Sequence, residues 1–158
     1  MDINYVGEHL WAGNTGNFFV VLSFCGALLS SLSYFIYSQN EVQNASWKSL
    51  GRSAFFIHAS GVLGIIGTLF YMLLNHFFEY HYVWQHSNTE MPMRYILSCF
   101  WEGQEGSFLL WTFWHVVLGT ILIFTAKSWE GPVMAVVALV QIFLASMLLG
   151  IYVFGYKI

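Results

Sequence analysis

Four windows of this chain contain no Asp, Glu, Lys or Arg, and each is longer than a transmembrane helix requires. They are residues 9–40, 53–78, 106–126 and 131–156. About 20 apolar residues are enough to cross the roughly 30 Å hydrocarbon core of a bilayer. Only 8% of the 158 residues are charged and 58% are hydrophobic, whereas a soluble domain carries about 25% charged residues. The sequence therefore predicts an integral membrane protein.

The predicted fold is all-α, with four transmembrane helices and a long loop between the second and the third. The helices are expected at about residues 16–37, 53–75, 106–126 and 133–154, and the loop, called the connecting loop below, at residues 76–105. Residues 1–158 then form a single membrane domain. The sequence stops almost where the fourth helix does, so we expect this chain to be the N-terminal part of a longer protein.

The few basic residues predict an orientation in the membrane. Lys48, Arg52 and Lys127 lie in the first and third linkers, whereas the connecting loop holds only Arg94 among Lys and Arg residues. Cytoplasmic segments carry the excess of Lys and Arg, so the linkers are expected in the cytoplasm and the loop outside. The net charge of −3 provides no basic surface for nucleic acid.

Two histidines lie within predicted helices. An ionisable residue in a transmembrane segment is a functional candidate by default, so His58 and His115 are candidate haem ligands. Their estimated depths differ by roughly 7 Å, and a neutral, hydrogen-bonded imidazole is the alternative at each position. His76, His81 and His86 are spaced five apart and cannot share one helical face. No metal site is expected.

The cysteines and carboxylates predict little chemistry by themselves. Cys25 and Cys99 are expected at different depths, too far apart for a disulfide, and neither belongs to a C-x-x-C-H haem-attachment motif.

Glu102 and Glu105 precede the third helix. Glu105 is expected to accept hydrogen bonds from free amides at the helix start, together with Ser107. A paired acid/base role for the two carboxylates would need a substrate between them.

The connecting loop carries a more specific signal in two runs of sequence. They are Tyr82-Val83-x-x-His86-Ser87-Asn88-x-x-Met91-Pro92-x-x-Tyr95 and Trp101-x-Gly103-Gln104-Glu105-Gly106-Ser107-x-Leu109-Leu110-Trp111. Together they resemble the first large periplasmic loop of the CcmF/NrfE haem-lyase family of cytochrome c biogenesis. The sequence departs from that pattern at Met91, where Leu is usual, and at Glu102, where a small residue is common.

The resemblance implies a function for the whole family protein. Such a haem lyase lies in the bacterial inner membrane, takes haem from a periplasmic haem chaperone and attaches it covalently to apocytochrome c, together with other cytochrome c maturation subunits. The haem-presenting segment and its ligands lie downstream of the region matched here. This chain alone is therefore expected neither to catalyse nor to hold the haem, and no catalytic residue is assigned.

The loop positions carried over by the resemblance are Tyr82, Ser87, Pro92, Tyr95, Trp101, Gly103, Gln104, Glu105, Gly106, Ser107 and Trp111. Two other functions stay open. The chain could be a small four-helix b-haem membrane protein that uses His58 and His115, or a structural accessory subunit without lyase activity.

Overall fold

The computed structural model describes residues 9–40, 44–149, 152–153 and 156–157. It confirms the predicted all-α fold. Within the described residues, four helices are long and apolar enough to cross a membrane. They are α1 (Leu10–Gln39), α2 (Ala45–Leu74), α5 (Gln104–Thr125) and α6 (Glu130–Leu149).

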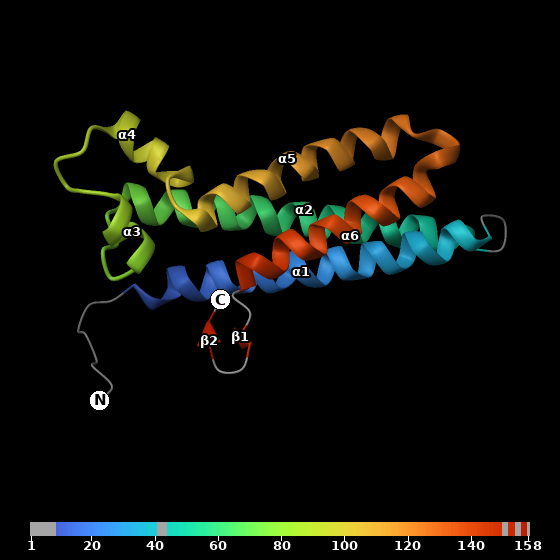
Figure 1. Ribbon diagram of the computed structural model, residues 1–158, viewed down its shortest axis with the longest axis horizontal. Helices are drawn as coiled ribbons and strands as arrows, with labels where there is room; N and C mark the ends of the chain where they lie inside the picture. The colour runs from blue at the N-terminus through green and yellow to red at the C-terminus, as the bar shows by residue number, and fades with distance from the viewer. Residues whose placement is uncertain (1–8, 41–43, 150–151, 154–155, 158) are drawn as a thin grey trace.

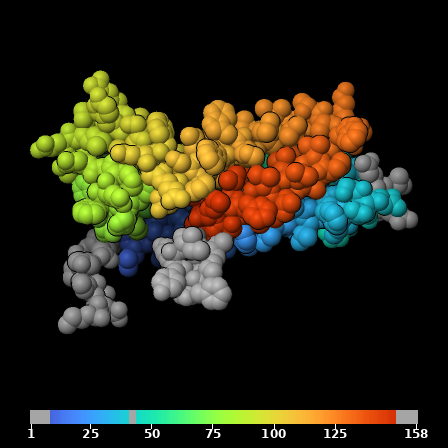
Figure 2. Space-filling model, viewed as in Figure 1, coloured from blue at the N-terminus to red at the C-terminus, as the bar shows by residue number. Residues whose placement is uncertain are grey.

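The four helices form an elongated bundle (Figure 1). Helix α1 packs along both α2 and α6, and α5 packs mainly on α6 and more briefly on α2. The end of α1, the start of α2 and residues 125–130 lie at one end, called the charged end below, and the connecting loop lies at the other, called the loop end. In Figure 2 the loop forms a block of side chains beyond the start of α5.

The remaining elements are short. The connecting loop contains α3 (His81–His86), α4 (Met93–Ser98) and the 3-10 helix η1 (Cys99–Trp101). A second 3-10 helix, η2 (Lys127–Trp129), joins α5 to α6, and the strands β1 (Tyr152–Val153) and β2 (Tyr156–Lys157) pair antiparallel. The connecting loop is thus a compact helical segment.

The helix ends differ from the predicted ones for physical reasons. Helix α1 begins before residue 16 because tertiary contacts hold its first turns, including a hydrogen bond from the Gly13 N–H to the Tyr80 hydroxyl at 2.8 Å. Helix α6 ends at Leu149 rather than near residue 154. Tyr152 and Val153, residue types that favour strands, form β1 instead.

Small residues bring α1 and α2 into backbone contact. A Cβ atom on Gly26 would lie 2.8 Å from the backbone nitrogen of His58, and one on Gly61 would lie 2.9 Å from the Cα of Ser23. Such close approach is typical of helix pairs in membranes, where dispersion contacts replace the hydrophobic effect as the driving force. His58 is completely buried as a result.

A buried carboxylate joins three helices at the charged end. The Glu130 side chain is 2% exposed and accepts hydrogen bonds from Arg52 Nε at 2.6 Å and Arg52 Nη2 at 2.7 Å. Lys48 Nζ lies 2.9 Å from Glu130 Oε2, and the Tyr34 hydroxyl donates to Oε1 at 3.2 Å. The sequence alone indicates no role for Glu130. Here it links α6 to α1 and α2.

Replacing Glu130 by Gln should destabilise the bundle. The substitution removes the charge that pairs with the partly exposed Arg52 and Lys48 side chains and weakens hydrogen bonds to a charged group, which are worth about 1.5–3 kcal/mol. We therefore expect a lower melting temperature of the purified protein in detergent. Glu90→Gln is the matched control, since Glu90 is exposed and only its backbone N–H makes a described hydrogen bond. Equal melting temperatures for the two variants would show that the ion cluster contributes no net stability.

Candidate functional site in the connecting loop

The start of the connecting loop is fastened to the start of α1. The Glu79 carboxylate lies 3.1 Å from the His9 backbone nitrogen and 2.9 Å from His9 Nδ1. The Tyr80 hydroxyl donates to the His9 carbonyl at 2.7 Å. The His9 ring stacks on Phe77 with ring centroids 4.1 Å apart. Two segments about 70 residues apart in sequence therefore meet at the loop end.

Tyr82 connects the two halves of the loop motif. Its hydroxyl donates to the Phe100 carbonyl at 2.8 Å and lies 3.1 Å from the Cys99 carbonyl. Burial raises the pKa of Tyr82 to about 12, and the negative charge of Glu105 acts in the same direction. The phenol therefore stays protonated, and a donor, at physiological pH.

Two motif glycines make room for this contact. A Cβ atom on Gly103 would lie 2.6 Å from the Tyr82 ring and 3.1 Å from the His86 ring. A Cβ on Gly106 would collide with the Phe100 carbonyl oxygen and lie 2.5 Å from the Tyr82 hydroxyl oxygen. A larger residue at Gly106 would thus push the first turn of α5 away from η1. Glycine at these positions permits close approach.

The other motif residues divide into hydrogen-bonded and exposed groups. The Ser87 hydroxyl donates to the Val83 carbonyl at 2.6 Å, and the Ser107 hydroxyl donates to the Trp101 carbonyl at 3.1 Å. Pro92 precedes α4, where its carbonyl accepts from the Tyr95 N–H at 2.8 Å. The side chains left exposed are those of Tyr95, Trp101, Gln104, Glu105 and Trp111.

The predicted cap at Glu105 is wrong. Gly103 is the N-cap residue of α5 and provides no side-chain hydrogen bond, and Ser107 is a donor to Trp101 rather than an acceptor for amides. Among the described residues, no hydrogen bond joins the Glu105 carboxylate to the first-turn amides. Capping side chains act from the N-cap itself, whereas Glu105 lies inside the first turn and is exposed. Its charge there favours the helix dipole.

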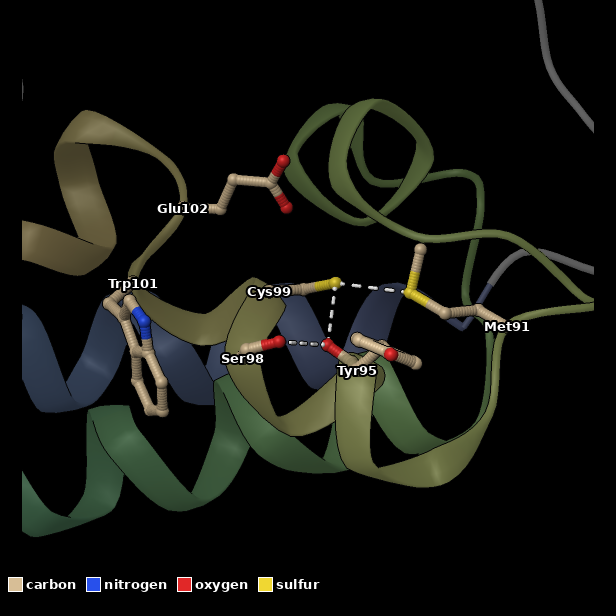
Figure 3. Close-up of a pocket in the computed structure, with 6 residues that line it drawn as sticks. All are labelled: Met91, Tyr95, Ser98, Cys99, Trp101 and Glu102. Atoms are coloured by element: carbon tan, nitrogen blue, oxygen red, sulfur yellow. Dashed lines mark hydrogen bonds between the residues drawn. The ribbon is translucent and has the colours of Figure 1, made fainter.

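A cavity of about 640 Å³ opens beside this motif, called the sulfur pocket below (Figure 3). Its lining residues come from the end of the connecting loop and are Met91, Tyr95, Ser98, Cys99, Trp101 and Glu102. Two of the lining residues, Met91 and Glu102, are positions at which the sequence departs from the motif that it resembles.

The two sulfur atoms of the pocket are in contact. The Cys99 thiol lies 3.4 Å from Met91 Sδ and 3.1 Å from the Tyr95 carbonyl oxygen. Burial raises the pKa of the Cys99 thiol, and the nearby Glu102 carboxylate raises it further, so the thiol stays protonated at neutral pH. This contact was not predicted from the sequence, in which Met91 stands out only as a departure from the family pattern and Cys99 only as a cysteine outside any haem-attachment motif. The separation of Met91 and Cys99 by eight residues, about two helical turns, is the feature of the sequence that could have indicated this contact.

The two intramembrane histidines lie in different surroundings. His58 Nδ1 is 2.9 Å from both the hydroxyl and the carbonyl oxygen of Ser23. His58 Nε2 is buried without a hydrogen-bond partner in the described part of the chain, as are His115 Nδ1 and the side-chain oxygen of Gln141. Gln141 Nε2 donates to the Thr112 carbonyl at 3.1 Å. Polar side chains thus connect α1 to α2 and α6 to α5 inside the bundle.

Comparison with known proteins confirms the resemblance predicted from the loop. The cytochrome c-type biogenesis protein CcmF of Haemophilus influenzae is 32% identical over 96 residues, which are 61% of this chain and 14% of that protein. CcmF of Pseudomonas fluorescens is 35% identical over 65 residues, 41% of this chain and 10% of that protein. The cytochrome c-type biogenesis protein ccl1 of Rhodobacter capsulatus is 27% identical over 97 residues.

The fold is shared with a solved cytochrome c haem lyase CcmF. The superposition covers 93% of this chain and 25% of the solved one, with a TM-score of 0.78 and 23% sequence identity. The chain thus spans a small part of the length of the proteins that it matches. No family model matches the chain.

The close packing at Gly106 gives a direct test of the loop structure. Gly106→Ala should destabilise the protein, because its methyl group collides with the Phe100 carbonyl and with Tyr82; overpacking of this kind costs about 1–3 kcal/mol. Gly67→Ala is the matched control, since a Cβ there meets nothing within 4 Å. Thermal unfolding in detergent should rank Gly106→Ala below the wild type and Gly67→Ala at or above it. The opposite order would contradict the contact between the two motif halves.

Proposed function

We propose that this chain is the N-terminal membrane part of a CcmF-type haem lyase, which attaches haem covalently to apocytochrome c in the periplasm. The observation that carries the proposal is the folded motif: its two halves, far apart in the loop, meet where Tyr82 contacts the Phe100 carbonyl and Gly106. The CcmF relatives and the shared fold support it. In this function the chain supplies scaffold and part of the periplasmic face.

The rest of the lyase would supply the catalytic machinery. The matched CcmF structure is about four times longer than the aligned region, so most of that protein lies outside the part matched here. Haem is therefore proposed as the substrate of the complete enzyme. Its proposed partners are a haem chaperone, apocytochrome c and other cytochrome c maturation subunits of the bacterial inner membrane.

A resident b-type haem ligated by His58 is the competing function, and the packing argues against it. The backbones of α1 and α2 touch at Gly26 and Gly61, so the helix pair around His58 has no gap that would admit a porphyrin on the α1 side. The His58 side chain itself is completely buried. An accessory subunit without lyase activity is the other alternative, and the variant described next distinguishes it.

Glu105 provides the functional test because it is an exposed motif residue without a described hydrogen bond. Glu105→Ala should leave the abundance and the melting temperature of the protein close to wild type and lower the covalent haem content of c-type cytochromes, measured by haem staining of denatured membrane proteins. Glu90→Ala, an exposed carboxylate outside the motif, should leave the haem content unchanged. Equal haem staining in both variants would favour an accessory role.

The orientation is tested by labelling single cysteines in intact cells, in a background with Cys25 and Cys99 replaced by Ala. Thr89 in the connecting loop and Ser46 near the charged end are both exposed. The excess of Lys and Arg at the charged end predicts that a membrane-impermeant maleimide labels Thr89→Cys and not Ser46→Cys. Labelling of Ser46→Cys alone would reverse the proposed topology.

A further inference from the structure

Helix α4 and the 3-10 helix η1 follow each other without a break and form one segment, residues 93–101, with a buried and an exposed side. The buried side chains are Ile96, Cys99 and Phe100, which are at most 3% exposed. The Phe100 ring stacks on Phe70 near the end of α2, with ring centroids 4.6 Å apart. This packing fixes which side of the segment faces outward.

The exposed side of the segment is mostly apolar. Met93, Leu97 and Trp101 follow one another at intervals of four residues, a spacing that places side chains along one line on a helix. They are 59%, 43% and 50% exposed and are called the apolar stripe below. The exposed Tyr95 ring adds to this surface. Contiguous exposed apolar surface marks a place of contact with a protein or a membrane.

The apolar stripe is attached directly to a spanning helix. Only Glu102 and Gly103 lie between Trp101 and Gln104, the first residue of α5, so Trp101 is within about 10 Å of the start of α5. The 22 residues of α5 measure about 33 Å, little more than the roughly 30 Å hydrocarbon core. The start of α5, and the apolar stripe beside it, therefore lie at the level of the membrane surface.

The apolar surface of the spanning helices leads up to the stripe. Helices α4 and α5 both contact α2, and Figure 1 shows them along the same side of it. On α5, Trp111 and Trp114 are more than half exposed, and in a bundle that spans a membrane such side chains face the lipid. The apolar stripe extends this lipid-facing surface toward the headgroups.

We propose that the segment of residues 93–101 lies in the membrane surface at the loop end, with the apolar stripe inserted between the lipid headgroups and the upper parts of the acyl chains. The occupant of this exposed face is then lipid rather than another protein. The proposal goes beyond the proposed function and does not depend on it, because it needs only a bundle that spans the membrane.

The polar groups of the exposed side also suit a lipid surface. Trp and Tyr are enriched at membrane interfaces, where the ring is in contact with lipid and its polar group with water. The Arg94 guanidinium lies 5.0 Å from the centroid of the Tyr95 ring, and a guanidinium pairs with phosphate through parallel hydrogen bonds. Arg94 is therefore placed to contact a lipid phosphate next to Tyr95.

The test measures the depth of the apolar stripe in phosphatidylcholine nanodiscs by quenching of a bimane label on Leu97→Cys. The background is Cys25→Ala with Cys99→Ser, which keeps a hydrogen-bond donor at the buried position. Thr89→Cys is the reference for water, and Trp114→Cys, midway along α5, is the reference for lipid; both residues are exposed. The quenchers are iodide in water and phospholipids that carry a nitroxide either near the headgroup or near the end of an acyl chain.

The label on Leu97→Cys should lose most of its emission to the nitroxide near the headgroup and less to the deep nitroxide. Iodide should quench it less than the label on Thr89→Cys. The label on Trp114→Cys should respond most to the deep nitroxide, because that residue lies in the middle of a spanning helix.

Three results would overturn the proposal. Iodide quenching as strong as at Thr89→Cys, without an effect of either lipid nitroxide, would place the stripe in water. Strongest quenching by the deep nitroxide would make the segment part of a membrane span. Protection from every quencher would show that protein covers the stripe. Thermal unfolding checks that each labelled variant is folded, and Met93→Cys, a second exposed position on the stripe, replaces Leu97→Cys if the latter unfolds.

Discussion

The buried Glu130 carboxylate fixes the arrangement of the bundle at the charged end. A carboxylate at low dielectric is stable only when its lone pairs are matched by donors, and here Arg52, Lys48 and Tyr34 provide them. These partners belong to α1 and α2, so α6 cannot slide along the helix pair without leaving the charge unpaired. Helix α5 follows through the short η2 connection.

At the loop end, the hydrogen bonds of Tyr82 hold the structure together, and the candidate site depends on them. Tyr82 holds the Cys99 and Phe100 carbonyls, and these two residues lie in the η1 turn next to the first turn of α5. Because Cys99 and Trp101 belong to the same turn and both line the sulfur pocket, the Tyr82 contact also helps to position these two lining residues.

The sequence predicted the spanning helices because their signal is local. Uncharged windows longer than a bilayer crossing are visible without any knowledge of the fold, and the loop motif is likewise a continuous pattern. Glu130 was missed because its partners, Tyr34, Lys48 and Arg52, meet it only after three helices assemble. The pairing of Glu130 with Lys48 and Arg52 could have been suggested from the sequence, because the two linkers near these residues were predicted on the same side of the membrane.

The errors at the loop end have a similar origin. The cap assigned to Glu105 depended on which residue begins α5, and a shift of the helix start to Gln104 makes Gly103 the N-cap. The sulfur pocket depends on where α4 begins and ends, because this helix separates Met91 from Cys99 and brings them into contact across eight positions. Tertiary contacts set the ends of helices and short turns, and these contacts cannot be read from the pattern of a single sequence.

The central claim, that the chain is part of a haem lyase, is tested most directly by removing the chain from its own cells and following apocytochrome c. The lyase function predicts that apocytochrome c without covalent haem accumulates, that b-type haem proteins keep their spectra, and that re-expression of the wild-type chain restores haem attachment. Fully haem-loaded c-type cytochromes in cells without the chain would contradict the account.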